Sequence, residues 1–159
     1  MRAINEATRR VPHISCEVAL DLQAELRDNF AEPEFQKQLQ VINRANQHQP
    51  AKLSIVRAEL IFEIQARVLP KYGFEPSQRG VGDMLMWFQN YQFDPEFQET
   101  SDECNYLLGI PHRFHSSPAQ EQETIKRAEE VLKWFDTSEG REWYAEELKS
   151  RARLSQKKK

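Results

Sequence analysis

The chain contains few cysteines and glycines, the residues that form redox motifs, zinc knuckles and phosphate-binding loops. Its two cysteines, Cys16 and Cys104, lie far apart and form no C-x-x-C pair. This argues against a zinc knuckle or a redox motif and predicts two free thiols, with Cys104 as a small core residue. The five glycines stand singly, so a glycine-rich phosphate loop is missing. No Ser, Cys or Lys stands in a motif for an activated nucleophile, and we expect neither a catalytic residue nor a cofactor.

Long hydrophobic runs are also missing. No stretch approaches the ~18 consecutive apolar residues of a membrane span. The beginning of the chain, MRAINEATRR, is basic but lacks the apolar segment of a secretory signal. An organelle presequence is the alternative, and Glu6 and the shortness of the segment argue against it. We therefore expect a cytoplasmic protein.

Charge is unevenly placed along the chain. The last nine residues, RARLSQKKK, carry five positive charges and no acid, whereas the formal net charge is −3. The other 150 residues therefore carry a net −8. An acidic body with a short basic tail argues against a general nucleic-acid-binding surface.

Apolar residues recur every three or four positions, and no segment alternates with period two. This predicts an all-α protein, a single-domain bundle of about five helices with a two-helix C-terminal extension. We expect an irregular segment over 1–14, a core over 15–111, a linker over 112–117, a helical pair over 118–154 and a basic tail over 155–159. Helix starts are marked by Ser15, Pro33, Pro50, Asp94-Pro95 and the capping box beginning at Ser117.

The most apolar stretch runs from Leu53 to Phe74. Its broad hydrophobic face predicts a helix inside the domain, a central rod on which the others pack. That face comprises Ile55, Val56, Leu60, Ile61, Ile64 and Val68, widened by Leu53, Phe62 and Leu69. Pro70 leaves two alternatives: the helix ends near Val68, or it bends there. Gly73 fits a left-handed cap onto which Phe74 folds back.

Three further patterns resemble binding sites, and each favours an ordinary structural role. His112 and His115 have a metal-binding spacing but fall in the predicted linker without further ligands, so we expect no metal. The backbone of Gly80-Val81-Gly82 could face an anion, although a turn before a helix is the favoured interpretation. The acid pairs Asp102-Glu103 and Glu129-Glu130 are expected on solvated helix faces.

Aromatic residues are the best candidates for a contact surface. Trp87, Phe88, Tyr91, Phe93 and Phe97 fall within eleven residues. Most should be core, and one or two should remain exposed for partner docking. Trp143 and Tyr144 point about 100° apart on their helix, so one can be buried in the body while the other faces elsewhere. The candidate docking residues are Trp87, Tyr91, Phe93, Phe97, Trp143 and Tyr144.

The basic tail allows three interpretations: a frayed end, cations that favour a helix C-terminus, or contact with an anionic partner such as RNA or a lipid surface. Its candidate anion-contacting residues are Arg151, Arg153, Lys157, Lys158 and Lys159.

From Ile14 to about Pro111 the chain resembles the protein C-ten family, small uncharacterised helical proteins of eukaryotes. The resemblance rests on LQAELRDNFAEPE, EIQARVLPKYGF, GVGDMLMWFQNYQFDPEF and YLLGIP in this order, and most clearly on Tyr72-Gly73-Phe74. It implies a cytoplasmic, non-enzymatic protein linked in vertebrates to brain development, without catalytic residues to transfer. Two departures are Pro70, within the central segment, and the helices beyond Pro118, which have no counterpart in that pattern.

The expected function is that of a non-enzymatic interaction protein, either an adaptor or a small subunit of a larger assembly with a protein partner. The alternative is a protein that binds nucleic acid or an anionic surface through its basic tail. An enzyme of unrecognised type is a third hypothesis and requires a concave pocket with convergent titratable residues. The sequence leaves the partner and the oligomeric state open.

Overall fold

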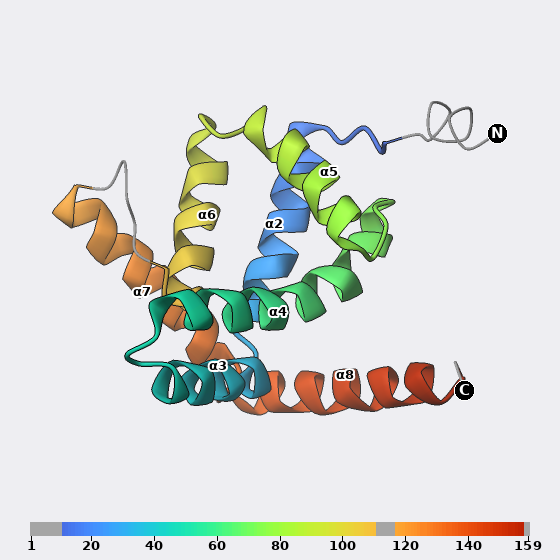
Figure 1. Ribbon diagram of the computed structural model, residues 1–159, viewed down its shortest axis with the longest axis vertical. Helices are drawn as coiled ribbons and strands as arrows, with labels where there is room; N and C mark the ends of the chain where they lie inside the picture. The colour runs from blue at the N-terminus through green and yellow to red at the C-terminus, as the bar shows by residue number, and fades with distance from the viewer. Residues whose placement is uncertain (1–10, 111–116, 158–159) are drawn as a thin grey trace.

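The computed structural model describes residues 11–110 and 117–157, and these residues form helices and no strand. The predicted all-α class is confirmed (Figure 1). Seven α-helices and one 3-10 helix occur in this part of the chain: α2 (Cys16–Phe30), α3 (Pro33–Ala45), α4 (Pro50–Val68), η1 (Leu69–Tyr72), α5 (Gln78–Gln89), α6 (Pro95–Leu108), α7 (Pro118–Trp134) and α8 (Ser138–Lys157).

The helix starts follow the capping residues of the sequence. The Ser15 hydroxyl oxygen accepts from the backbone N–H of Val18 at 3.2 Å at the start of α2. Ser117 and Gln120 form a reciprocal capping box at the start of α7. Each cap satisfies backbone donors that would otherwise lack a partner within the helix, and this fixes where the helix begins.

The end of α4 decides between the two alternatives at Pro70. α4 ends at Val68, and Pro70 lies in the 3-10 turn that follows. Gly73 adopts a left-handed backbone with φ 87°, and the N–H of Phe74 then donates to the carbonyl of Leu69 at 3.2 Å. Phe74 is buried, as its predicted return onto the last turn requires.

The core is built around α2 rather than around the most apolar stretch of the sequence. α2 buries Ala19, Leu22, Leu26 and Phe30, and it packs most extensively against α6 and next against α4. Figure 1 shows α2 between α5 and α6, with α4 crossing its lower end. α2 is therefore the central rod of this fold.

The prediction that the Leu53–Phe74 helix lies inside the domain is wrong for its first half. Leu60, Ile64 and Val68 are buried, but Ile55 is 63% exposed. The covered half lies against α2, while the first half has α3 as its neighbour (Figure 1). Hydrophobic periodicity identifies an apolar face but carries no information on how far along the helix its neighbours extend.

The C-terminal helices contribute to the same core. α7 packs along α6 and buries Thr124 and Ala128, and Phe135 is buried directly after it. Figure 1 shows α8 leaving this region as a long helix below α4. The predicted linker, with His112 and His115, lies outside the described residues except for Ser117, which already caps α7.

Candidate binding cleft

The aromatic cluster predicted at the junction of α5 and α6 is mostly structural. Phe97 is buried and contacts Phe88 edge to face at a ring distance of 5.0 Å. The Tyr91 hydroxyl donates to the carbonyl of Ile14 at 2.6 Å, and Trp87 is half-buried. Phe93, in contrast, is 78% exposed.

The predicted pair at the start of α8 separates as expected. Tyr144 is partly buried and contacts Phe135 at a ring distance of 5.6 Å, while Trp143 is 45% exposed. Trp143 also lies 5.8 Å from Trp134 of α7, measured between ring centroids. The α5–α6 junction and the start of α8 lie at opposite ends of the body in Figure 1, so the structure does not bring the two predicted aromatic sets together.

The basic residues near the end of the chain are not equivalent. Arg151 donates from Nη2 and Nη1 to the two carboxylate oxygens of Glu32, at 2.6 and 3.1 Å. Arg153 is exposed, and α8 continues as far as Lys157. Lys158 and Lys159 lie outside the described residues. Arg151 is therefore part of the folded body rather than of a frayed tail.

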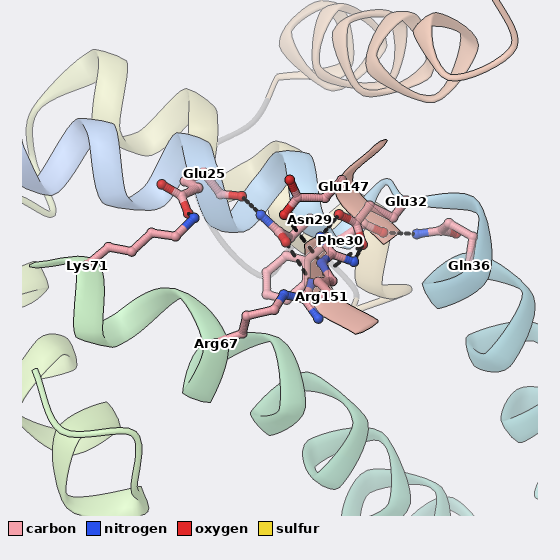
Figure 2. A network of polar contacts seen from close by, with 9 residues as sticks. All are labelled: Glu25, Asn29, Phe30, Glu32, Gln36, Arg67, Lys71, Glu147 and Arg151. Atoms are coloured by element: carbon pink, nitrogen blue, oxygen red, sulfur yellow. Dashed lines mark hydrogen bonds and ion pairs between the residues drawn. The ribbon is translucent and has the colours of Figure 1, made fainter. Parts of the chain in front are cut away.

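The buried carboxylate of Glu32 joins three parts of the chain. It follows α2 and also lies 3.5 Å from Arg67 Nη2, which donates to Asn29 Oδ1 at 2.7 Å. Arg151 in turn lies 3.4 Å from Glu147, one turn earlier on α8. Figure 2 shows these side chains converging from α2, α4 and α8. We call Glu32, Asn29, Arg67, Glu147 and Arg151 the Glu32 cluster.

The prediction that Glu103 is solvated is wrong. Glu103 is only 4% exposed, and its carboxylate lies 3.5 Å from Arg27 Nη1 and 3.7 Å from Arg127 Nε. Burial raises the pKa of this carboxyl, although the two arginines act in the opposite direction. Arg27 also pairs with Asp28 at 3.1 Å. We call these four residues the Glu103 cluster.

A cleft of about 810 Å³ is lined by residues of α2, the end of α4, η1, α6, α7 and α8. Both clusters contribute to its walls, and Lys71 pairs with Glu25 at 2.7 Å on the same surface. The apolar residues of the lining are Val131, Trp134, Phe135 and Trp143, which we call the apolar wall, and both tryptophans are exposed. The lining residues are Glu25, Arg27, Asp28, Asn29, Arg67, Lys71, Glu103, Arg127, Glu130, Val131, Trp134, Phe135, Trp143, Glu147 and Arg151. We call this the α7–α8 cleft.

Other candidate sites gain no support. Within residues 11–110 and 117–157, no group of three or more potential ligands is arranged for a metal ion. The N–H of Gly80 donates to Ser77 Oγ at 3.2 Å, and a Cβ at Gly80 would lie 1.8 Å from the Glu75 carbonyl oxygen. Gly80 therefore serves a close backbone contact. No helix in the described part of the chain combines the length and apolar character needed to cross a bilayer.

No local sequence pattern indicates the α7–α8 cleft as a whole, but one of its members, Glu103, can be identified from the sequence. Glu103 shares a helical stripe with Thr100, Cys104 and Leu107, at spacings of three and four residues. This spacing indicates that Glu103 lies on a buried face, where an acid requires a partner. The partners Arg27 and Arg127 lie far from it in sequence, and no local pattern identifies them.

Comparison with known proteins gives no further constraint. No family model matches the chain, and neither a curated protein nor a solved structure shows significant similarity to it.

Proposed function

We propose that this protein is a helical interaction protein that binds a protein partner in the α7–α8 cleft. The observation that carries the proposal is the apolar wall of the cleft, where Trp134 is 36% exposed and Trp143 is 45% exposed. Tryptophan is enriched among the residues that dominate binding energy at protein interfaces. The pair comes from two different helices, so a partner docked here would contact α7 and α8 together.

The charged residues of the α7–α8 cleft support a binding role. Glu32 and Glu103 are buried behind arginine partners, so neither carboxylate is presented to a ligand. Paired in this way, they hold the walls of the cleft in place. The cleft does meet the requirement of a concave pocket with titratable residues, and an enzyme therefore stays an alternative. The resemblance to the protein C-ten family also stays a prediction, and it implies a non-enzymatic role.

Affinity capture from native lysate with two matched variants tests the proposal. Trp143→Ala removes an exposed aromatic from the α7–α8 cleft, and Phe93→Ala removes one from the α5–α6 junction. Both positions are exposed, so circular dichroism should show folded protein in each case. We expect a partner identified by mass spectrometry to be lost with Trp143→Ala and retained with Phe93→Ala.

The opposite pattern, loss with Phe93→Ala alone, would place the interface at the α5–α6 junction and refute the cleft as the site. A wild-type protein that captures nothing above background and stays monomeric would refute the interaction role itself.

The alternative, binding of nucleic acid or an anionic surface through the basic tail, now rests on fewer residues. Arg151 is held by Glu32, which leaves Arg153, Lys157, Lys158 and Lys159 as candidates. Deleting the residues after Ser155 should then weaken binding to RNA and flatten its salt dependence. Binding that ignores salt and survives this deletion would exclude the alternative.

A further inference from the structure

Within the described residues, every cation that lines the α7–α8 cleft has an acid partner, whereas one lining acid, Glu130, has no cation partner. Lys71 is matched by Glu25 at 2.7 Å. In the Glu103 cluster, Arg27 and Arg127 pair with Asp28 and Glu103, and Arg127 also lies 4.0 Å from Glu99 and 3.8 Å from Glu123. In the Glu32 cluster, Arg67 and Arg151 share Glu32, which is not part of the lining, and Arg151 also pairs with Glu147. The remaining charged residue of the lining is Glu130, and the described residues supply it with no ion-pair partner.

Glu130 lies on the same helix as one of the tryptophans of the apolar wall. Glu130 lies one helical turn before Trp134 on α7, and Glu147 lies one turn after Trp143 on α8, so each acid shares a helix face with a tryptophan. All four residues line the same cleft. The cleft therefore joins exposed indole rings to a carboxylate that has no cation of its own.

From this geometry we infer that the occupant of the α7–α8 cleft is a basic side chain, arginine or lysine, presented by the partner protein. The alkyl stem of such a side chain packs on an indole ring, and its cationic head is attracted to the face of the ring. Glu130 then supplies the neutralising charge. An acidic segment would place its charge beside Glu130, while each cation of the cleft lining already has an acid partner. The inference rests on the proposed function and adds the chemistry of the partner.

The three tryptophans of the chain allow a direct test by nuclear magnetic resonance. Each indole N–H gives one signal, and Trp→Phe variants assign them. Trp134 and Trp143 line the cleft, whereas Trp87 lies against His13 at a ring distance of 4.4 Å and serves as an internal reference. The probes are N-acetyl-arginine amide, its neutral analogue N-acetyl-citrulline amide, and N-acetyl-glutamate amide.

We expect the arginine probe to shift the Trp134 and Trp143 signals in a saturable manner and to leave Trp87 unchanged. The citrulline and glutamate probes should produce no saturable shift. Glu130→Gln should raise the apparent Kd of the arginine probe by about two- to fivefold, in line with the loss of an exposed ion pair. The matched control is Glu129→Gln, the same charge change at a residue whose carboxylate accepts from the Tyr106 hydroxyl at 3.3 Å.

Several outcomes would overturn the inference. Equal shifts with the citrulline probe would show that charge plays no part, and shifts with the glutamate probe would assign the cleft to an acidic partner. Shifts caused by raising the protein concentration alone would assign it to a second copy of this chain. If capture depends on Trp143 while the arginine probe has no effect, the partner chemistry fails and the interaction role stands. If the probe binds as expected but no protein is captured, the cleft recognises a basic side chain and the interaction role fails.

Discussion

Replacing Arg151 by alanine tests whether α8 is fastened to the body through the Glu32 cluster. The substitution removes two hydrogen bonds to the Glu32 carboxylate, which is only 4% exposed, and leaves it with Arg67 at 3.5 Å. Breaking a buried ion pair costs about 3–5 kcal/mol when the remaining charge has no other partner. Hydrogen bonds to a charged group contribute about 1.5–3 kcal/mol.

Because Arg67 continues to compensate Glu32, the lower of these ranges applies. We expect Arg151→Ala to reduce the free energy of unfolding by about 2 kcal/mol. For a chain of this size that corresponds to a Tm lower by about 4–8 °C. Arg153→Ala is the matched control, since Arg153 is exposed on the same helix, and its effect should stay within about 0.5 kcal/mol.

Urea denaturation followed by far-ultraviolet circular dichroism measures the change, and hydrogen exchange shows whether α8 opens separately from the body. A double-mutant cycle with Glu32→Gln isolates the pairwise contribution. Equal effects of Arg151→Ala and Arg153→Ala would refute the reasoning. So would a coupling energy near zero, because the loss would then arise from packing of the arginine stem.

Two further predictions concern the core and the alkaline limit of stability. Ile64→Ala should lower the free energy of unfolding by about 2–5 kcal/mol in chemical denaturation, because it leaves a cavity at a buried site. Ile55→Ala, on the exposed half of the same helix, should lower it by less than about 0.5 kcal/mol. Equal losses would contradict the observed burial. Burial and a neighbouring carboxylate raise the pKa of Tyr72 to about 12 from 10.0. Its contribution to stability is therefore fully present below about pH 10 and is lost as the pH rises through about 12. Tyr72→Phe should remove one late-ionising phenol from the ultraviolet titration and make stability less sensitive to pH in this range; a titration identical to that of the wild type would contradict the assignment.

Local features of this fold could be read from the sequence because they depend on neighbouring residues. Ser15, Asp94 and Ser117 begin helices through hydrogen bonds within four residues, and Gly73 and Gly109 end helices through left-handed backbone. The separation of Trp143 from Tyr144 follows from helical geometry alone. In each case the interactions that determine the feature are made within one or two helical turns.

Features that depend on contacts across the fold could not be read in the same way. α4 has the most apolar sequence, yet α2 has the more deeply buried face, because neighbours cover it along its whole length. The sequence predicts Glu103 in solvent because it belongs to an acid pair, Asp102-Glu103, and its arginine partners lie far away along the chain. Arg27 is 76 residues away from Glu103, and Arg151 is 119 residues away from Glu32.

These distant pairs also connect stability with the proposed binding site. A protein with a buried carboxylate between two arginines is often no more stable than one with well-packed apolar residues in their place. Stability alone therefore does not explain why these charges are buried. Here the Glu103 cluster joins α2, α6 and α7, and the Glu32 cluster joins α2, α4 and α8. The two clusters therefore position the helices that carry Trp134 and Trp143. If this is their role, Arg151→Lys, which keeps the positive charge but loses the two-pronged hydrogen bonding to Glu32, should weaken binding of the arginine probe by more than Arg153→Lys at the exposed position, at temperatures where both variants are folded. Equal affinities would mean that the cluster stabilises the fold without shaping the α7–α8 cleft.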